Sequence, residues 1–249
     1  MRIRTEDPRR NLELFREITY HGRGIVTGIT PSGRYLDQIY FLEGRSENSR
    51  NRIFEYEGSW LRTAPADPSK VTDPSLIIYE AMLETRGRYI VSNGVQTKKA
   101  CEVLRGGYMF RTAMDSFSYE PDAPNYTPRI TSMFHLEHKA VVFSIIRRKS
   151  KDDDRPDRAL YTYQNRDPRR ELRPGVGYAV TTYEGDGDPL PSFHGGPYEL
   201  PLYEDADEAI DTYWDSLSGN RVSIALKRIE ISTGQSHIIA INQFDKVSA

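Results

Sequence analysis

The chain of 249 residues carries 34 basic and 36 acidic side chains, for a formal net charge of -2, and 37% of its residues are hydrophobic. This balance excludes the overall basic field that attracts nucleic acid. The hydrophobic content is sufficient to fill a core, so we expect a folded, soluble protein. The single cysteine, Cys101, excludes an internal disulfide and a thiolate metal cluster. No apolar run approaches the roughly 20 residues that span a bilayer, and no secretory signal is evident, so we expect a cytoplasmic protein with no membrane partner.

The first quarter of the chain predicts a helix followed by a β-hairpin. Leu12, Phe15 and Ile18 recur at helical spacing. Residues 23–28 and 35–42 are typical of strands, and the turn between them contains a proline that presets φ and a glycine that tolerates positive φ. The hairpin therefore leads directly into the polar segment that follows.

That polar segment, Gly44-Arg45-Ser46-Glu47-Asn48-Ser49-Arg50-Asn51-Arg52, crowds three guanidinium groups beside two hydroxyl groups. Arginine offers a planar fork of donors that stays charged near neutral pH, which suits a phosphate or a carboxylate. One interpretation is an anion-binding loop. The other is a solvated surface loop whose arginines pair with nearby glutamates.

The middle of the chain alternates short strands and helices. Residues 53–56, 60–63 and 88–92 have strand character, and helices are expected over about 97–105 and 108–117. The strand ending at Ser92 leads into Asn93-Gly94 and then a helix. This arrangement places an amide and helical N–H groups at one sheet edge, where they either meet a polar ligand or form an ordinary turn.

The segment Tyr119-Glu120-Pro121-Asp122-Ala123-Pro124-Asn125-Tyr126-Thr127-Pro128-Arg129 carries three prolines in eleven residues. It is therefore neither a regular helix nor a central strand, and we expect an ordered, extended loop. Two carboxylates, two phenols, an amide and an arginine on a stiffened backbone provide the parts of a general acid–base site.

Strands follow at residues 130–136 and 139–147. His135, Glu137 and His138 resemble a metal cluster, but residues three apart on a strand point to opposite faces, so we predict no metal site. The charged run 149–158 is interpreted as a solvated loop. Residues 184–201 are rich in glycine and proline and form either a lid or a long connector.

The last quarter contains one helix and one hairpin. Asp205 and Glu208 predict the start of an amphipathic helix, and residues 221–231 and 237–241 predict a closing hairpin. The apolar alternation shifts phase at Lys227-Arg228, which predicts a bulge. Because hairpins dominate and helices occur singly or in pairs, we expect an α+β sandwich of antiparallel sheets in a single domain over residues 1–249.

Four motifs, in chain order, resemble those of the archaeal-type IMP cyclohydrolase family. They are Gly22-Arg23-Gly24-Ile25, Arg45-Ser46 with Asn51-Arg52, Ser92-Asn93-Gly94, and Tyr119-Glu120 with Thr127-Pro128-Arg129-Ile130. The resemblance implies a four-layered αββα fold similar to that of N-terminal nucleophile hydrolases. Two segments depart from the family pattern: the arginine segment is longer, and extra residues precede Thr127.

The resemblance implies the last step of purine biosynthesis, in which a formylated aminoimidazole carboxamide ribotide closes to inosine monophosphate (IMP) with loss of water. This activity is classed among hydrolases of cyclic amidine C–N bonds and needs no metal or redox cofactor. The implied nucleotide-binding residues are Arg45, Ser46 and Arg52 for the phosphate, Arg23 for phosphate or oxyanion, and Asn93 for the base. The implied catalytic residues are Glu120 with Tyr119 or Arg129, for proton transfer and polarisation.

Two other functions stay open from the sequence. One is a different amide-processing hydrolase of the same fold, and the other is a purine nucleotide-binding protein without catalysis. The intact set of Tyr119, Glu120 and Arg129 argues against pure binding, while the altered loop lengths leave open a substrate other than the purine ribotide. Assembly into a homo-oligomer is also left open.

Overall fold

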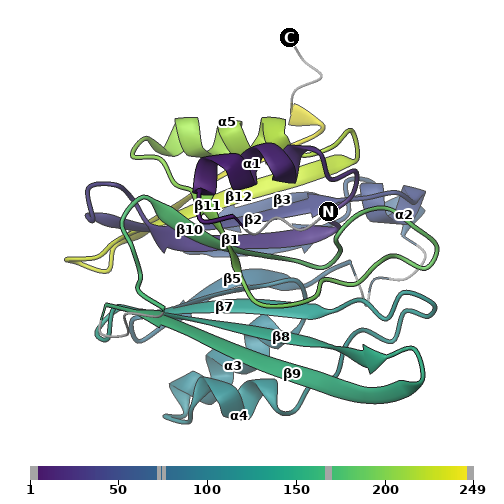
Figure 1. The fold of residues 1–249 in the computed structure, drawn as a ribbon, viewed down its shortest axis with the longest axis horizontal. Helices are drawn as coiled ribbons and strands as arrows, with labels where there is room; N and C mark the ends of the chain where they lie inside the picture. Colours follow the sequence, from purple (N-terminus) through teal and green to yellow (C-terminus); the bar gives the residue numbers. More distant parts are fainter. Residues whose placement is uncertain (1–4, 72–73, 75–76, 166–169, 246–249) are drawn as a thin grey trace.

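The structure is a computed structural model that describes residues 5–71, 74, 77–165 and 170–245. Two antiparallel sheets pack face to face, and helices cover both outer faces, which makes four layers (Figure 1). The predicted α+β sandwich of antiparallel sheets is therefore confirmed. Within the described residues, no helix is long and apolar enough to cross a membrane.

The six-stranded sheet has the strand order β11-β10-β1-β2-β12-β13. Its outer face is covered by α1 and α5 (Figure 1). Asp7 and Asp205 cap these two helices, because the carboxylate of each accepts a hydrogen bond from a backbone N–H of the first turn. The elements are α1 Pro8–Arg16, β1 Arg23–Ile29, β2 Tyr35–Glu43, β10 Val176–Thr181, β11 Tyr198–Pro201, α5 Ala206–Ser216, β12 Arg221–Glu230 and β13 Ser236–Asn242.

The seven-stranded sheet follows chain order, from β3 at one edge to β9 at the other. Its outer face is covered by α3 and α4 (Figure 1). Short helices α2, Glu47–Arg50, and η1, Pro68–Lys70, lie in the connections. The remaining elements are β3 Ile53–Glu57, β4 Trp60–Ala64, β5 Glu80–Thr85, β6 Arg88–Ser92, α3 Gln96–Arg105, α4 Phe110–Met114, β7 Arg129–His135, β8 Ala140–Ser150 and β9 Asp153–Gln164.

The alternation of side chains along the strands divides the apolar residues between two cores. On β7, Ile130 and Phe134 belong to the large core between the sheets, whereas Met133 belongs to the smaller core beneath α3 and α4. Cys101 is buried in that smaller core, as expected for a small packing residue. Burial on both faces explains why the central strands are apolar almost throughout.

The charged run 149–158 is not a loop, because β8 extends to Ser150 and β9 begins at Asp153. Opposite charges face each other across this hairpin. Arg147 Nη2 lies 2.8 Å from Asp157 Oδ2, and Lys149 Nζ lies 3.1 Å from Asp153 Oδ2. The charges that suggested a solvated loop instead form cross-strand pairs, which are compatible with a strand.

The bulge predicted at Lys227-Arg228 is also wrong, because the register of β12 is continuous there, and its irregularity lies between Arg221 and Ser223. Both basic side chains are buried through ion pairs. Lys227 Nζ lies 2.6 Å from Glu84 Oε2, and Arg228 Nη2 lies 2.8 Å from Asp37 Oδ2. Paired charges on the two faces of a regular strand therefore mimic a phase shift in the apolar pattern.

Strand pairing gathers several predicted site residues at one end of the sandwich. Arg23 at the start of β1 pairs with Leu42 near the end of β2, which leads into α2. On the other sheet, Ser92 at the end of β6 pairs with Thr131 near the start of β7. Segments far apart in the chain therefore meet at this end.

Candidate active site

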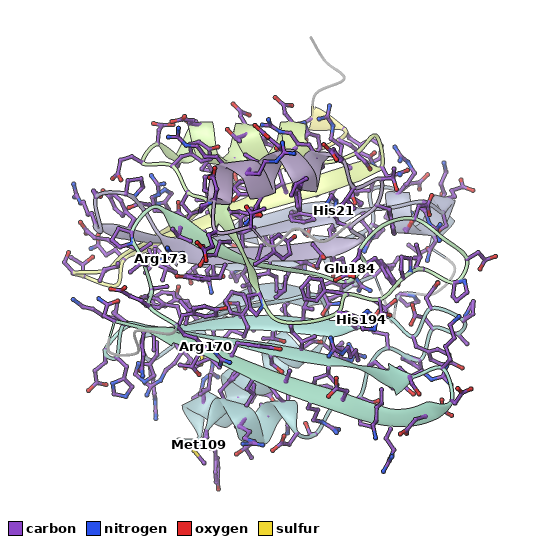
Figure 2. All side chains as sticks on the ribbon, viewed as in Figure 1. His21, Met109, Arg170, Arg173, Glu184 and His194 are labelled. Atoms are coloured by element: carbon purple, nitrogen blue, oxygen red, sulfur yellow. The ribbon has the colours of Figure 1, made fainter. Side chains whose placement is uncertain are left out.

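A cavity of about 310 Å³ opens at this end of the sandwich. Its volume lies at the lower end of the roughly 300–1,000 Å³ typical of small-molecule sites. Figure 2 shows Glu184 and His194 on the same side of the molecule as α2, and Arg170 and Arg173 on the opposite side. The lining residues are Tyr20, Gly22, Arg23, Glu43, Arg45, Ser46, Asn48, Ser49, Arg52, Ile77, Glu120, Asp122, Asn125, Thr127, Tyr183 and Leu190.

A buried ion pair between Arg23 and Glu120 lines the cavity. Arg23 donates to both carboxylate oxygens of Glu120, over 3.0 and 2.6 Å, and to the carbonyl of Asn93 over 2.9 Å. Glu120 is 2% exposed, and Arg129 Nη1 lies 3.6 Å from its Oε1. Burial opposes the charge of Arg23, but Glu120 raises the pKa of Arg23 well above its ordinary value. The cation is therefore fixed beside the cavity at any physiological pH.

The proline-rich loop holds Glu120 in place through its own backbone. The N–H of Glu120 donates to the carbonyl of Thr127 over 2.9 Å, which closes the loop at its neck. Asn93 then ties the loop to β6: its Nδ2 donates to the carbonyl of Pro128 over 2.8 Å, and its Oδ1 accepts from the N–H of Ile130 over 2.8 Å. The position of Glu120 is therefore determined by rigid elements.

Two further side chains of this loop and one that follows β10 form a continuous chain of hydrogen bonds. Thr127 Oγ1 makes short hydrogen bonds to the carboxylate of Asp122 and to the hydroxyl of Tyr183. The N–H of Thr127 donates to the other oxygen of Asp122 over 2.7 Å. Burial raises the pKa of Tyr183, although the hydrogen bond to Thr127 lowers it in part. The phenol is accordingly neutral.

The opposite rim of the cavity is built on α2. Ser46 caps this short helix, because its hydroxyl accepts from the N–H of Ser49 over 3.2 Å and the Ser49 hydroxyl accepts from the N–H of Ser46 over 3.0 Å. Arg45 makes a short ion pair with Asp186, and its guanidinium lies 5.1 Å from the centre of the Tyr20 ring. The predicted arginine loop thus contains a helical turn.

Arg52 supplies the charge of this rim that has no carboxylate partner. It is 4% exposed, and it donates to the carbonyls of Ser49 and Glu43 over 2.7 and 3.3 Å. Within the described residues, no carboxylate oxygen lies within 4.0 Å of its guanidinium nitrogens. A buried cation that meets only carbonyl groups favours an anion in the adjoining cavity.

The carboxylate of Glu43, in contrast, is fully engaged in hydrogen bonds away from the arginines. It accepts from the N–H of His21 over 2.5 Å and from the N–H and hydroxyl of Ser218 over 3.0 and 2.7 Å. Burial raises the pKa of Glu43, but the contacts with His21 and Ser218 lower it overall. Glu43 therefore stays ionised, and its carboxylate is held by His21 and Ser218 rather than by an arginine of the rim.

Comparison with known families gives a match. A family model described as IMP cyclohydrolase-like protein matches residues 20–234. The chain belongs to this family. No curated protein matches the chain. The match includes every residue that lines the cavity.

Of the eight site residues predicted from the sequence of this IMP cyclohydrolase-like chain, five line the cavity: Arg23, Arg45, Ser46, Arg52 and Glu120. Arg129 lies behind Glu120 and donates to Gln96 Oε1 over 3.1 Å. Asn93 is fully buried, and its amide is occupied by the proline-rich loop, as described above. Tyr119 lies outside the lining, and its hydroxyl donates to the carbonyl of Asp154 over 2.8 Å.

Several residues of the site carry no signal in the sequence. Tyr20 and Tyr183 reach the cavity from segments 163 residues apart and stack with ring centroids 5.9 Å apart. Tyr40 and Tyr79 form a buried pair with hydroxyls 2.7 Å apart, and both raise the pKa of Arg23, which places them near it. Only the tertiary fold brings these phenols together, so local patterns could not reveal them.

The three residues of the rejected metal cluster lie closer together than the sequence indicated. Strand β7 ends at His135, and the following turn brings the rings of His135 and His138 within 4.0 Å of each other, beside Glu137. The premise that these residues lie on opposite faces of a strand is therefore wrong. The cluster lies at the far end of β7 from Arg129, about 20 Å away at the usual rise per residue, and outside the cavity.

Proposed function

We propose that this chain closes the purine ring of formylated aminoimidazole carboxamide ribotide to give IMP and water. The observation that carries the proposal is that two arginines with different partners line the same cavity. Arg23 is fixed by Glu120, and among the described residues Arg52 meets carbonyl groups and no carboxylate. The family supports a cyclohydrolase-like activity in general, and the cavity supports this particular assignment of its two ends.

The phosphate of the ribotide is assigned to the α2 rim. Arg52 lacks a carboxylate partner within the described residues, and the ion pair of Arg45 with Asp186 is one in which both side chains are more than one third exposed. A dianionic phosphate competes well for such groups, because charge-assisted hydrogen bonds to guanidinium are stronger than those to neutral carbonyls. The Ser46 hydroxyl lies on the same rim.

The reacting groups are assigned to the Arg23 end. The carboxamide nitrogen attacks the formyl carbon of the same molecule, so that a C–N bond forms and the C=O electron pair moves onto oxygen. Arg23, held by Glu120, is placed to stabilise that oxygen. The C–O bond then breaks, and the oxygen leaves as water. The reaction transfers no electrons, so it requires no redox cofactor.

The cavity contributes chiefly by holding the substrate in one conformation. The two reacting groups belong to one molecule, and fixing them in contact removes much of the entropic cost of their encounter. The rigid Glu120 loop and the fixed Arg23 provide this preorganisation without a rearrangement during the reaction.

The test is to incubate the purified protein with the formylated ribotide and to follow ring closure by ultraviolet absorbance. We expect turnover that falls by about 10²- to 10³-fold in Arg23→Gln, because one stabilising donor is lost. The matched control is Arg34→Gln, which changes an exposed arginine of the same sheet that pairs with Glu230.

Two outcomes would contradict the proposal. Tight binding of IMP without any ring closure would indicate a nucleotide-binding protein. Ring closure that is equally fast in Arg23→Gln and Arg34→Gln would remove the Arg23 end of the cavity from the reaction.

A further inference from the structure

One wall of the cavity is a row of three side chains that the assignment above does not use. Asp122 and Thr127 come from the proline-rich loop, and Tyr183 follows β10. All three line the cavity, and short hydrogen bonds connect them in the order Asp122, Thr127, Tyr183. Thr127 is 1% exposed and Tyr183 is 4% exposed, so water does not substitute for these contacts.

The direction of these hydrogen bonds follows from the number of protons available. A threonine hydroxyl has one proton, and a carboxylate accepts only. Both oxygens of Asp122 accept from Thr127, one from its N–H and one from its hydroxyl. The Thr127 proton therefore points at Asp122, and the Tyr183 hydroxyl must donate to Thr127.

This direction determines what Tyr183 presents to the cavity. Because its single proton is given to Thr127, the phenol oxygen has only lone pairs left for a ligand. An anion gains nothing there, whereas an N–H group of the ligand finds an acceptor. The backbone N–H of Arg23 donates to Thr182 Oγ1 over 3.0 Å, and Thr182 precedes Tyr183, so the acceptor lies near the Arg23–Glu120 pair, where the reaction was assigned.

We propose that Tyr183, Thr127 and Asp122 form a proton relay for the carboxamide nitrogen of the substrate. This inference rests on the proposed function. Tyr183 is the catalytic residue, because it touches the substrate, and Thr127 and Asp122 act through it. Buried phenols are poor bases alone, but the relay lets Tyr183 accept one proton while it gives up another, so no charge develops on the ring.

The protons balance over the two steps. As the C–N bond forms, an amide proton passes to Tyr183, the Tyr183 proton passes to Thr127, and the Thr127 proton passes to Asp122. When the C–O bond breaks, the relay runs in reverse and returns one proton to the departing oxygen. The second proton of the water comes from the formamido N–H, whose nitrogen forms the new C=N bond.

The decisive variant is Thr127→Val, which keeps the shape of the side chain and removes the hydroxyl. We expect kcat to fall by about 10²-fold, in the lower range of acid–base effects, while KM and IMP affinity change by less than about threefold. Thr127→Ser restores the hydroxyl and should recover most of the turnover. Tyr163→Phe serves as the control, since it removes a phenol outside the cavity.

A measurement in mixtures of H₂O and D₂O separates a relay from a structural role. Concerted transfer of several protons gives a curved dependence of kcat on the deuterium fraction, and we expect this curve in the wild type and in Thr127→Ser but not in Thr127→Val. Melting temperatures of all variants report whether the loop stays folded.

The outcomes distinguish this inference from the proposed function. An inactive wild type defeats the proposed function and the relay together. An active wild type with a Thr127→Val variant within threefold of it defeats the relay alone. Failure of Thr127→Ser to recover turnover, with a lowered melting temperature in both variants, would mean that Thr127 only supports the loop.

Discussion

The two walls of the cavity differ in how firmly their charged groups are held. On the α2 rim, the side chains of Arg45 and its partner Asp186 are 37% and 52% exposed. In the proline-rich loop, Glu120 is 2% exposed and is bound by two nitrogens of Arg23. The first pair can exchange partners at little cost, whereas the second cannot separate without leaving buried charges unpaired.

This difference indicates a division of labour. A rim that exchanges ion-pair partners can admit and release a charged ligand. A loop whose carboxylate, backbone and neighbours are all hydrogen-bonded suits the reaction itself, because catalytic groups must be held within a fraction of an ångström. The predictions below test whether binding and turnover divide along the same line.

The largest effect is expected from Glu120→Gln. The amide loses one of the two anionic oxygens that hold Arg23, so we expect the rate of ring closure to fall by about 10²- to 10⁴-fold. The same change leaves a buried cation poorly compensated, so the melting temperature should also fall. Turnover, melting temperature and IMP affinity should be measured together.

Glu230→Gln is the matched control for that variant, since it removes the same charge from an ion pair with the exposed Arg34. It should leave turnover unchanged. Near-normal turnover in a stable Glu120→Gln protein would instead remove Glu120 from the reaction and leave Asp122 as the carboxylate to examine.

A smaller effect, on binding, is expected from Arg52→Ala. Loss of a charge-assisted hydrogen bond worth about 1.5–3 kcal/mol weakens IMP affinity by roughly 10- to 100-fold. Arg50→Ala is the matched control in the same arginine-rich segment, because Arg50 donates to the carbonyl of Gly44 and to Gln243 and does not line the cavity. Calorimetric titration should separate the two variants, and equal affinities would contradict a phosphate site at α2.

The fold was largely predictable because its signals are local. Apolar alternation and turn residues located β1, β2 and β6 to within one residue, and the Asp205 cap located the start of α5. The failures have one physical cause. Charges at 149–158 and at Lys227-Arg228 imitate loops and bulges until their partners, which lie on other strands or on the opposite sheet, are known.

The site was predictable only where one segment carries several functional groups. The arginine segment and the proline-rich loop each concentrate polar side chains, and both reach the cavity. Tyr183 and Tyr20 are single residues beside strands, and nothing local distinguishes them from core phenols. Asn93 carries a clear local motif, and in the structure its amide holds the backbone of the proline-rich loop.

The smallest effect is expected from Asp186→Asn, and its sign matters more than its size. Asp186 pairs with Arg45, so a phosphate that binds Arg45 must displace it. An exposed ion pair is worth about 0.2–1 kcal/mol, so removing this competitor should tighten IMP binding by roughly 1.5- to 5-fold. Asp188→Asn changes the same charge in the same loop, and Asp188 makes no ion pair with the described residues. Because screening weakens both effects, the titrations belong at low ionic strength. If Asp186→Asn binds IMP no more tightly than Asp188→Asn, then Arg45 does not exchange Asp186 for the phosphate, and the rim is as fixed as the loop opposite.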